Sequence, residues 1–176
     1  EMNKIIIVGG GSAGWMSAAT LIKAFPNRDI TLIESPNTPT VGVGESTIGQ
    51  IRQWTKFLGI DDKDFIPYTD ASIKLSIKFT DFYKKGQEFH YPFGQPDLTG
   101  NQAELNDWWF KKLALPETKN SDYADCISPQ MALVNENKCH HNTDLFNYKK
   151  DTAFHFDATK FGLWLKDHYC IPRGVK

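Results

Sequence analysis

A glycine-rich segment directly after a short apolar run restricts the fold of this chain more than any other feature of its sequence. The run, residues 5–8, precedes Gly9, Gly11 and Gly14, which have the spacing G-x-G-x-x-G. Its β-branched residues do not alternate with polar ones, as is typical of a parallel strand buried on both faces. In this spacing the glycines permit a tight turn, a close approach of backbone to a pyrophosphate, and close packing of the next helix. The segment therefore predicts a strand, a phosphate-binding turn and a helix over residues 13–25.

A second strand is predicted over residues 29–33, and Glu34 follows it directly. Glu34 follows Gly14 by about 20 residues, where a carboxylate accepts hydrogen bonds from a ribose hydroxyl. The helix would direct its N-terminal N–H groups and its positive dipole end at the phosphates. Together these elements predict a nucleotide site, with a ligand-free glycine-rich connection as the alternative. The acid argues against NADP, whereas NAD and FAD both stay open.

Composition and charge exclude several classes of partner. A net charge of −1 and a hydrophobic content of 40% indicate a globular chain, with no reason to expect nucleic acid or an anionic membrane. The apolar runs are too short to span a bilayer. The three cysteines, Cys126, Cys139 and Cys170, are widely spaced, which predicts neither a disulfide framework nor a metal site. We expect a soluble, cytoplasmic protein, and its oligomeric state stays open, with a homodimer as one alternative.

Residues 35–49 are rich in glycine and proline and predict a loop. Two interpretations of its central part, residues 42–47, are equally good from spacing alone. Ser46 or Thr47 can cap a following helix over residues 48–58, which makes the segment a connector. Alternatively, the glycines allow the backbone to lie as a strap over a flat ligand.

Residues 73–80 alternate between apolar and polar side chains, which predicts one half-buried strand. Lys74 and Lys78 would then share a face with Ser76 and Thr80. Lysines are mostly exposed, so a solvated face is the expected interpretation. If that face lined a closed cavity, a lysine amine would be a nucleophile or a hydrogen-bond donor.

The region after this strand predicts fewer parallel strands than a doubly wound sheet needs. Residues 84–101 predict a loop that contains several aromatic side chains, which either pack on the core or hold a planar substrate. Helices are expected over residues 103–113, over residues 121–134 with a break at Pro129, and after the N-cap residue Asp157. The region therefore predicts an insertion from which the chain returns to the sheet.

Four segments now stand in order: GGGSAG with Glu34, VGVGESTI, SIKF, and YPFG followed by DWWF and AFHFDATKFGLWL. Together they resemble the N-terminal part of the flavin-dependent tryptophan-halogenase family. The resemblance implies an α/β, Rossmann-like FAD-binding fold of the flavin monooxygenase type, incomplete in this chain. Residues 1–176 would be the N-terminal part of one domain. Residues 1–50 would form the dinucleotide-binding βαβ unit and the flavin strap, and residues 51–176 an inserted substrate-side region of helices and strands with a returning helix.

The resemblance also implies a chemistry. Reduced FAD, oxygen and a halide, chloride or bromide, yield hypohalous acid, which the lysine of the IKF segment, Lys78, holds or carries as a haloamine beside an electron-rich aromatic substrate. Lys74 is then expected to be a surface lysine. A separate flavin reductase would supply the reduced FAD. The residues expected to hold FAD belong to the glycine-rich turn, its acid and the strap: Gly9, Gly11, Ser12, Ala13, Gly14, Glu34, Gly42, Val43, Gly44, Glu45, Ser46 and Thr47.

The substrate residues implied by the resemblance are His90, Tyr91 and Phe93. Tyr91 stands where tryptophan-specific members have a histidine, so we expect another electron-rich, indole-like aromatic. The catalytic glutamate and the halide-binding backbone of the family would lie beyond Lys176. Two alternatives stay open: a flavin monooxygenase that hydroxylates without Lys78, and a non-catalytic FAD-binding fragment.

Overall fold

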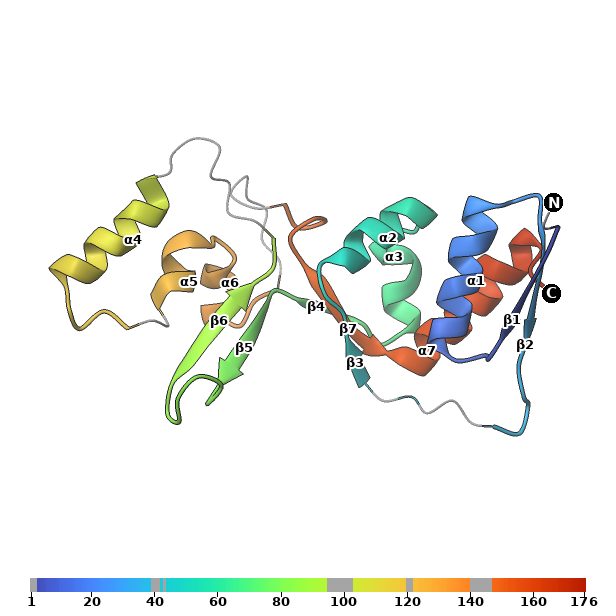
Figure 1. Cartoon of the computed structure of the whole chain (residues 1–176), viewed down its shortest axis with the longest axis horizontal. Coiled ribbons are helices and arrows are strands. Elements are labelled where there is room, and N and C mark those ends of the chain that lie inside the picture. Colours follow the sequence, from blue (N-terminus) through green and yellow to red (C-terminus); the bar gives the residue numbers. More distant parts are fainter. Residues whose placement is uncertain (1–2, 39–41, 43, 95–102, 120–121, 140–146) are drawn as a thin grey trace. The chain divides into compact units, whose positions relative to one another are not determined.

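The computed structural model describes residues 3–38, 42, 44–94, 103–119, 122–139 and 147–176 (Figure 1). These residues divide into two compact units. Unit 1 contains Glu1–Thr47, Gln53–Ser72 and Phe154–Lys176, and unit 2 contains Ile48–Arg52 and Ile73–Ala153. In this part of the chain, no helix is both long enough and apolar enough to cross a membrane.

Unit 1 contains the predicted βαβ arrangement. Strands β1 (Lys4–Val8) and β2 (Asp29–Ile33) pair in parallel, with Lys4 opposite Asp29 and Val8 opposite Ile33. Helix α1 (Ser12–Ala24) connects them. On the other side of β2, the Lys176 N–H donates to the Ile30 carbonyl at 3.0 Å, and the Leu32 N–H donates to the Lys176 carbonyl at 2.7 Å. The chain thus returns to the β-sheet, as expected.

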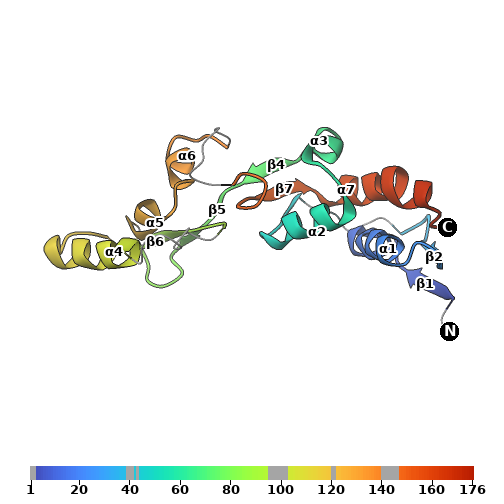
Figure 2. The same ribbon diagram turned by 90° about the horizontal axis from the view of Figure 1, so that it is seen from above.

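Helix α1 is amphipathic, and its buried face is formed by Trp15, Ala18, Ala19 and Ile22. These positions follow the 3.6-residue period of a helix that packs one face against a core. Helix α7 (Ala158–Trp164) packs beside α1, and the two run side by side in Figure 2. A π-helical segment, Leu165–Cys170, and a 3₁₀ turn, Ile171–Arg173, follow α7.

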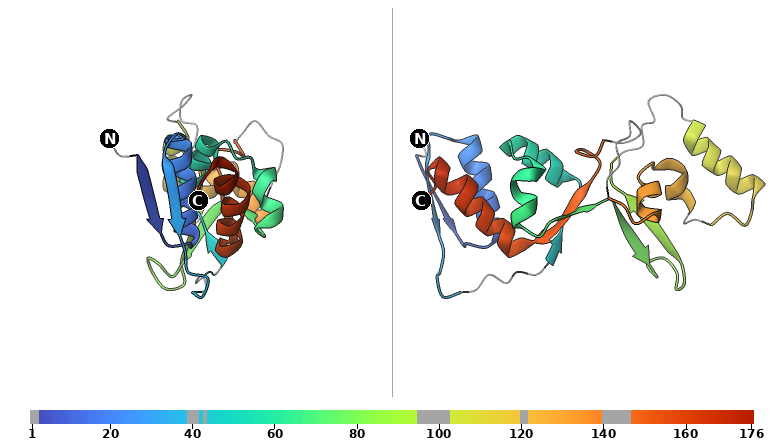
Figure 3. Two further views of the ribbon diagram at one scale, coloured as in Figure 1. Left: turned by 90° about the vertical axis from the view of Figure 1, so that its right-hand side faces the viewer. Right: turned by 180° about the vertical axis from the view of Figure 1, so that it is seen from behind.

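The prediction that β1 is buried on both faces is wrong. Ile6 is 55% exposed and Val8 is 82% exposed, and Ile33 of β2 is also exposed. Helices α1 and α7 lie on the same side of the two strands (Figure 3), where Ile30 and Leu32 are buried. A run of apolar residues shows only that the side chains are apolar. Whether they are buried depends on which elements cover each face of the strand.

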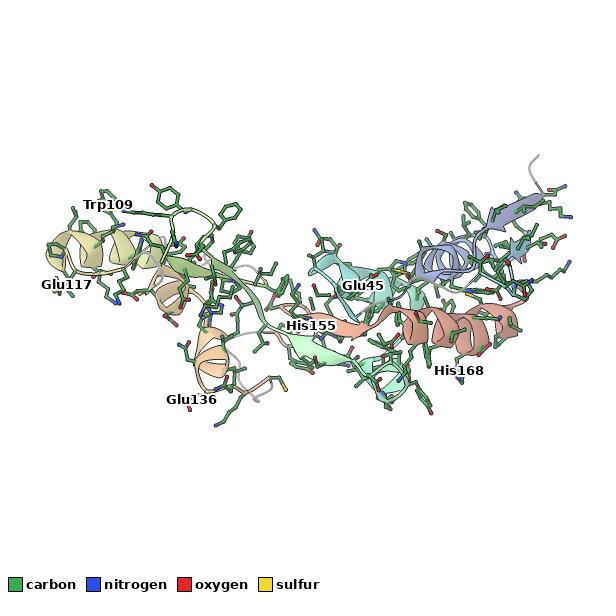
Figure 4. All side chains as sticks on the ribbon, turned by 90° about the horizontal axis from the view of Figure 1, so that it is seen from below. Glu45, Trp109, Glu117, Glu136, His155 and His168 are labelled. Atoms are coloured by element: carbon green, nitrogen blue, oxygen red, sulfur yellow. The ribbon has the colours of Figure 1, made fainter. Side chains whose placement is uncertain are left out.

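A second sheet has the strand order β3-β7-β4. Its strands are β3 (Gly44–Ser46), β7 (Ala153–Asp157) and β4 (Ser72–Lys74). Strand β3 runs antiparallel to β7, and Glu45 and His155 mark these strands in Figure 4. The loop predicted over residues 35–49 is therefore wrong for residues 44–46, because β7 supplies backbone partners to this segment.

An aromatic cluster forms the core of unit 1. Helix α2 (Gln50–Leu58) and helix α3 (Asp62–Phe65), which has a capping box at Asp61, precede a 3₁₀ turn at Ile66–Tyr68. The Phe65 ring meets the Phe154 ring edge-on, with centroids 5.1 Å apart, and Phe156 stacks on Phe161 at 4.4 Å. Phe65, Phe154 and Phe161 are fully buried. This cluster joins α3, β7 and α7, which are far apart in sequence.

Unit 2 is built on an antiparallel hairpin of β5 (Ser76–Thr80) and β6 (Glu88–Pro92). Strand β6 lies where a loop was predicted, and the single strand predicted over residues 73–80 is interrupted at Leu75. Three helices accompany the hairpin: α4 (Ala103–Ala114), α5 (Asp122–Ile127) and α6 (Met131–Asn135). The break predicted at Pro129 is confirmed, since it separates α5 from α6. Helix α5 packs against β6 and α4.

Candidate active site

The turn between β1 and α1 requires glycine at two positions. Gly9 has φ +121°, a conformation that residues with a Cβ rarely adopt, and its N–H donates to the Ile33 carbonyl at 2.9 Å. A Cβ at Gly14 would lie 1.9 Å from the Gly9 carbonyl oxygen. These are the tight turn and the close packing that the spacing predicts for the first and third glycines.

The parallel register brings Glu34 next to this turn. Val8 pairs with Ile33, so Gly10 and Glu34 emerge at the same edge of the sheet. A Cβ at Gly10 would lie 1.9 Å from Oε2 of Glu34. The other carboxylate oxygen, Oε1, accepts a hydrogen bond from Lys166 Nζ at 2.6 Å. Gly10 and Lys166 were both missed in the sequence. The middle position of the GGG run was a signal for Gly10, whereas Lys166 lies 132 residues from Glu34 and no sequence pattern pointed to it.

The residues around this turn fit a dinucleotide. Helix α1 begins at Ser12, with Gly11 as its N-cap residue, and has no acidic side chain in its first turn. Its free N–H groups and positive dipole end are therefore available to a phosphate. Glu34 lies beside the turn, where a ribose would follow the phosphates. Gly9, Gly11, Ser12, Ala13, Gly14 and Glu34 thus come together, as the sequence predicts.

The described residues of the strap are attached to β7 and α7. Gly42 lies so close to Thr159 of α7 that a Cβ would be 1.8 Å from its Oγ1. Gly44, Glu45 and Ser46 form β3, and Val43 lies outside the described residues. The Thr47 N–H donates to the Phe154 carbonyl at 2.8 Å, and the Thr47 hydroxyl accepts from the Phe154 N–H at 2.9 Å.

Lys74 is buried, so the expectation of a surface lysine is wrong. Only 8% of the residue is exposed, and its Nζ lies 5.2 Å from the centre of the Phe93 ring. The interruption at Leu75 explains this placement, because the Phe93 N–H donates to the Leu75 carbonyl at 2.9 Å and brings the ring to Lys74. Loss of hydration on burial lowers the pKa of Lys74 below the usual value for lysine.

Lys78, to which the resemblance assigns the chemistry, has an ordinary surface environment. Its Nζ lies 2.8 Å from Oε2 of Glu88, and the two side chains are 48% and 52% exposed. Lysines at protein surfaces commonly form such solvated ion pairs with carboxylates.

The three predicted substrate residues have different environments. Tyr91 is 64% exposed, whereas Phe93 is buried against Lys74. Gln130 donates a side-chain hydrogen bond to the Phe93 carbonyl. His90 pairs with Lys78 across the hairpin, so it points to the opposite face of β6 from Tyr91. The structure therefore groups Phe93 with Lys74 and places His90 elsewhere.

His90 lines a cavity of about 390 Å³, together with Phe89, Trp108, Tyr123 and Ala124. The Trp108 and Tyr123 rings meet edge-on with centroids 5.4 Å apart. His90 Nδ1 lies 3.0 Å from the Ser76 hydroxyl, and burial lowers the pKa of His90. The size and aromatic lining suit a planar apolar group. The position of Trp108 along its helix does not by itself predict that it lines a cavity.

Metal-binding clusters are absent from the described ranges, where no group of three or more His, Cys, Asp or Glu side chains converges. The three cysteines are free thiols. Cys170 is buried and Cys126 and Cys139 are exposed. Burial raises the pKa of the Cys170 thiol to about 12, so this group is an inert part of the core of unit 1.

Comparisons with known proteins show what this chain is similar to. The tryptophan halogenase family model matches residues 4–176. The 7-chloro-L-tryptophan 6-halogenase KtzR of Kutzneria sp. (strain 744) is 42% identical over 98% of this chain and 37% of its own length. The apo structure of VirX1 has a TM-score of 0.88 and 38% identity over 100% of this chain and 35% of that chain. The tryptophan 6-halogenase SttH from Streptomyces toxytricini has a TM-score of 0.77 and 30% identity over 99% of this chain and 36% of that chain.

The chain thus spans about a third of the length of these relatives. Because the family match covers nearly every residue, together with the nucleotide turn and the strap, the chain belongs to the tryptophan halogenase family.

Proposed function

We propose that the protein containing this chain is a flavin-dependent halogenase that acts on an electron-rich, indole-like aromatic substrate. Relatives matched over all of this chain are named tryptophan 6-halogenase ThaL, from Streptomyces albogriseolus, and tryptophan 7-halogenase RebH, from Lentzea aerocolonigenes. Within the chain, the observation that carries the proposal is the buried amine of Lys74 beside the Phe93 ring.

The nucleotide turn, Glu34 and the strap would hold FAD through its phosphates and ribose. When bound in its reduced form, the flavin supplies hypohalous acid from oxygen and a halide. A separate flavin reductase would deliver the reduced cofactor, as the resemblance to the family implies. The roles of this chain are to bind the cofactor and to receive the oxidant.

Lys74 rather than Lys78 is the lysine that would receive hypohalous acid. Residues 72–74 and 76–78 both read Ser-Ile-Lys, and the resemblance was matched to the second copy. Burial distinguishes the two, because a lysine amine reacts only when neutral, and the lowered pKa of Lys74 favours that form. Lys78 is held in a solvated ion pair with Glu88.

The neutral Lys74 amine can serve in two ways. It can donate a hydrogen bond to hypohalous acid, or it can attack the halogen so that an N–halogen bond forms, the O–halogen bond breaks and water leaves. Transfer of the halogen to an aromatic carbon then returns the amine, and the ring carbon loses its proton. Burial of Lys74 would also protect the oxidant from bulk water.

Two matched variants test this proposal. The full-length protein is incubated with a flavin reductase, NADH, FAD, bromide and a panel of indoles, and products are measured by mass spectrometry. We expect Lys74→Met to lower the halogenation rate by about 10²-fold or more, the usual scale for loss of a group that acts on the reacting atoms. Lys78→Met should retain activity, and a chemical trap should still detect hypohalous acid with Lys74→Met.

Loss of activity in Lys78→Met with retention in Lys74→Met would return the role to Lys78. Hydroxylated products without any halogenated ones would refute the halogenase assignment.

A further inference from the structure

The carboxylate of Glu34 is held by a residue from the far end of the chain. We propose that Lys166 is a positioning residue of the nucleotide site, which fixes Glu34 for the adenosine ribose of the dinucleotide. The inference rests on the proposed function, because that dinucleotide is FAD.

The contacts of the two carboxylate oxygens support this role. Lys166 Nζ lies 2.6 Å from Oε1, while Oε2 lies over Gly10 at the glycine-rich turn. The lysine occupies one oxygen of an acceptor with about four lone-pair sites, so the carboxylate keeps capacity for ribose hydroxyls. Glu34 is thus directed at the turn where the phosphates would bind, and Lys166 approaches it from the π-helical segment after α7.

Lys166 is itself restrained. Its Nζ lies 5.5 Å from the centre of the Trp15 ring, and Trp15, directly after Gly14, is 3% exposed. A cation over an indole face is attracted by the ring quadrupole. The ammonium therefore has two fixed partners, one on α1 and one at the end of β2. Fixing a charged side chain before the ligand arrives lowers the ordering cost of binding.

The same side of the helical segment that begins with α7 contacts three parts of the nucleotide site. Thr159 meets Gly42 of the strap, and a Cβ at Gly162 would lie 3.3 Å from Cα of Ser12, at the start of α1. Lys166 follows at the spacing that keeps helical residues on one face. The segment is therefore one wall of the site, and Lys166 is the charged group in that wall that contacts Glu34.

The ion pair itself contributes little to folding. The Lys166 and Glu34 side chains are 30% and 35% exposed, and solvated ion pairs add little to stability. Lys166 should therefore affect FAD affinity more than the unfolding midpoint. A purely structural lysine would show the opposite pattern.

The test compares flavins with and without the adenosine half. Dissociation constants for FAD and FMN are measured by titration calorimetry on the flavin-free, full-length protein and its Lys166→Met and Lys166→Arg variants. FMN lacks the adenosine ribose, so it does not reach Glu34. We expect Lys166→Met to weaken FAD binding about tenfold, the scale of one charge-assisted hydrogen bond, and to leave FMN binding unchanged. Lys166→Arg keeps the charge and should restore FAD affinity.

The Glu34→Gln variant shows whether Lys166 acts on FAD binding directly or through Glu34. In Glu34→Gln, the further change Lys166→Met should cause no additional loss of FAD affinity. Equal loss of FAD and FMN binding in Lys166→Met, or unchanged FAD binding, would overturn the inference alone. Failure of the wild-type protein to bind FAD would overturn the proposed function and this inference with it.

Discussion

The imidazole of His90 is placed among charges on the β5–β6 hairpin. Burial and the ammonium of Lys78, which faces it across the hairpin, lower the pKa of His90 below its usual value, and Asp125 and Glu88 act in the opposite direction. The Ser76 hydroxyl lies 3.0 Å from Nδ1. The folded protein therefore holds His90 in its neutral form more firmly than the unfolded chain does.

This placement predicts a dependence of stability on pH. The pKa of His90 in the folded protein lies below the unfolded value of about 6.5. Its contribution to the free energy of unfolding is therefore fully present above pH 6.5 and is lost as the pH falls toward the folded pKa. His90→Gln cannot bind the proton, so the variant should lose less stability than the wild type between about pH 7.5 and pH 5.5. Urea unfolding of both proteins at the two pH values measures the difference. Identical losses would show that His90 does not titrate differently on folding.

Among the elements, α7 depends on a single capping residue. The carboxylate of Asp157 accepts a hydrogen bond from the Lys160 N–H at 2.9 Å, and the Asp157 N–H donates to the Thr69 carbonyl at 3.0 Å. The segment His155-Phe156-Asp157-Ala158 therefore forms the junction between β7 and α7. Its first three residues end β7, and the aspartate begins the helix that carries Thr159 and leads to Lys166.

Removing this cap should destabilise the protein measurably. Asp157→Ala leaves an N–H of the first turn without its acceptor, and we expect a loss of about 1 kcal/mol in the free energy of unfolding. Asp157→Asn keeps a capping oxygen and is the matched control, with a much smaller loss. Denaturant unfolding monitored by circular dichroism compares the three proteins. Equal losses in both variants would assign the effect to the negative charge rather than to the cap.

At the scale of the whole molecule, the residues that would hold FAD all belong to unit 1, and the hairpin with its cavity belongs to unit 2. Ligand that binds only the native state stabilises it by about 2.7 kcal/mol at 100 times its dissociation constant. The free energy of local openings that disrupt the site should rise by the same amount, so these openings become rarer. The free energy of openings elsewhere should not change.

Hydrogen exchange with and without FAD tests this division. We expect FAD to slow exchange in β1, α1 and β2 and to leave exchange in β5 and β6 unchanged, because the hairpin contains none of the residues that would hold FAD. Glu34→Gln, measured at the same FAD concentration, should show weaker protection in unit 1. Equal protection of both units in the wild-type protein would mean that FAD binding stabilises them together.

Short-range sequence patterns determined the parts of this protein that depend on neighbours along the chain. The glycine spacing specified the turn after β1 and the helix after it, since φ at Gly9 and packing at Gly14 are local requirements. Pro129 specified the break between α5 and α6, and Asp157 the start of α7. These features follow from backbone geometry and from single hydrogen bonds, which a short segment contains in full.

Tertiary structure alone decided which side chains are buried and which are paired. Lys74 and Lys78 end identical Ser-Ile-Lys segments. Lys74 nevertheless lies against Phe93, whereas Lys78 forms an exposed ion pair with Glu88. Lys166 reaches Glu34 because α7 and the π-helical segment that follows it pack on α1. Desolvation and ion pairing depend on residues brought together from distant parts of the chain, and the periodicity of one segment carries no information about them.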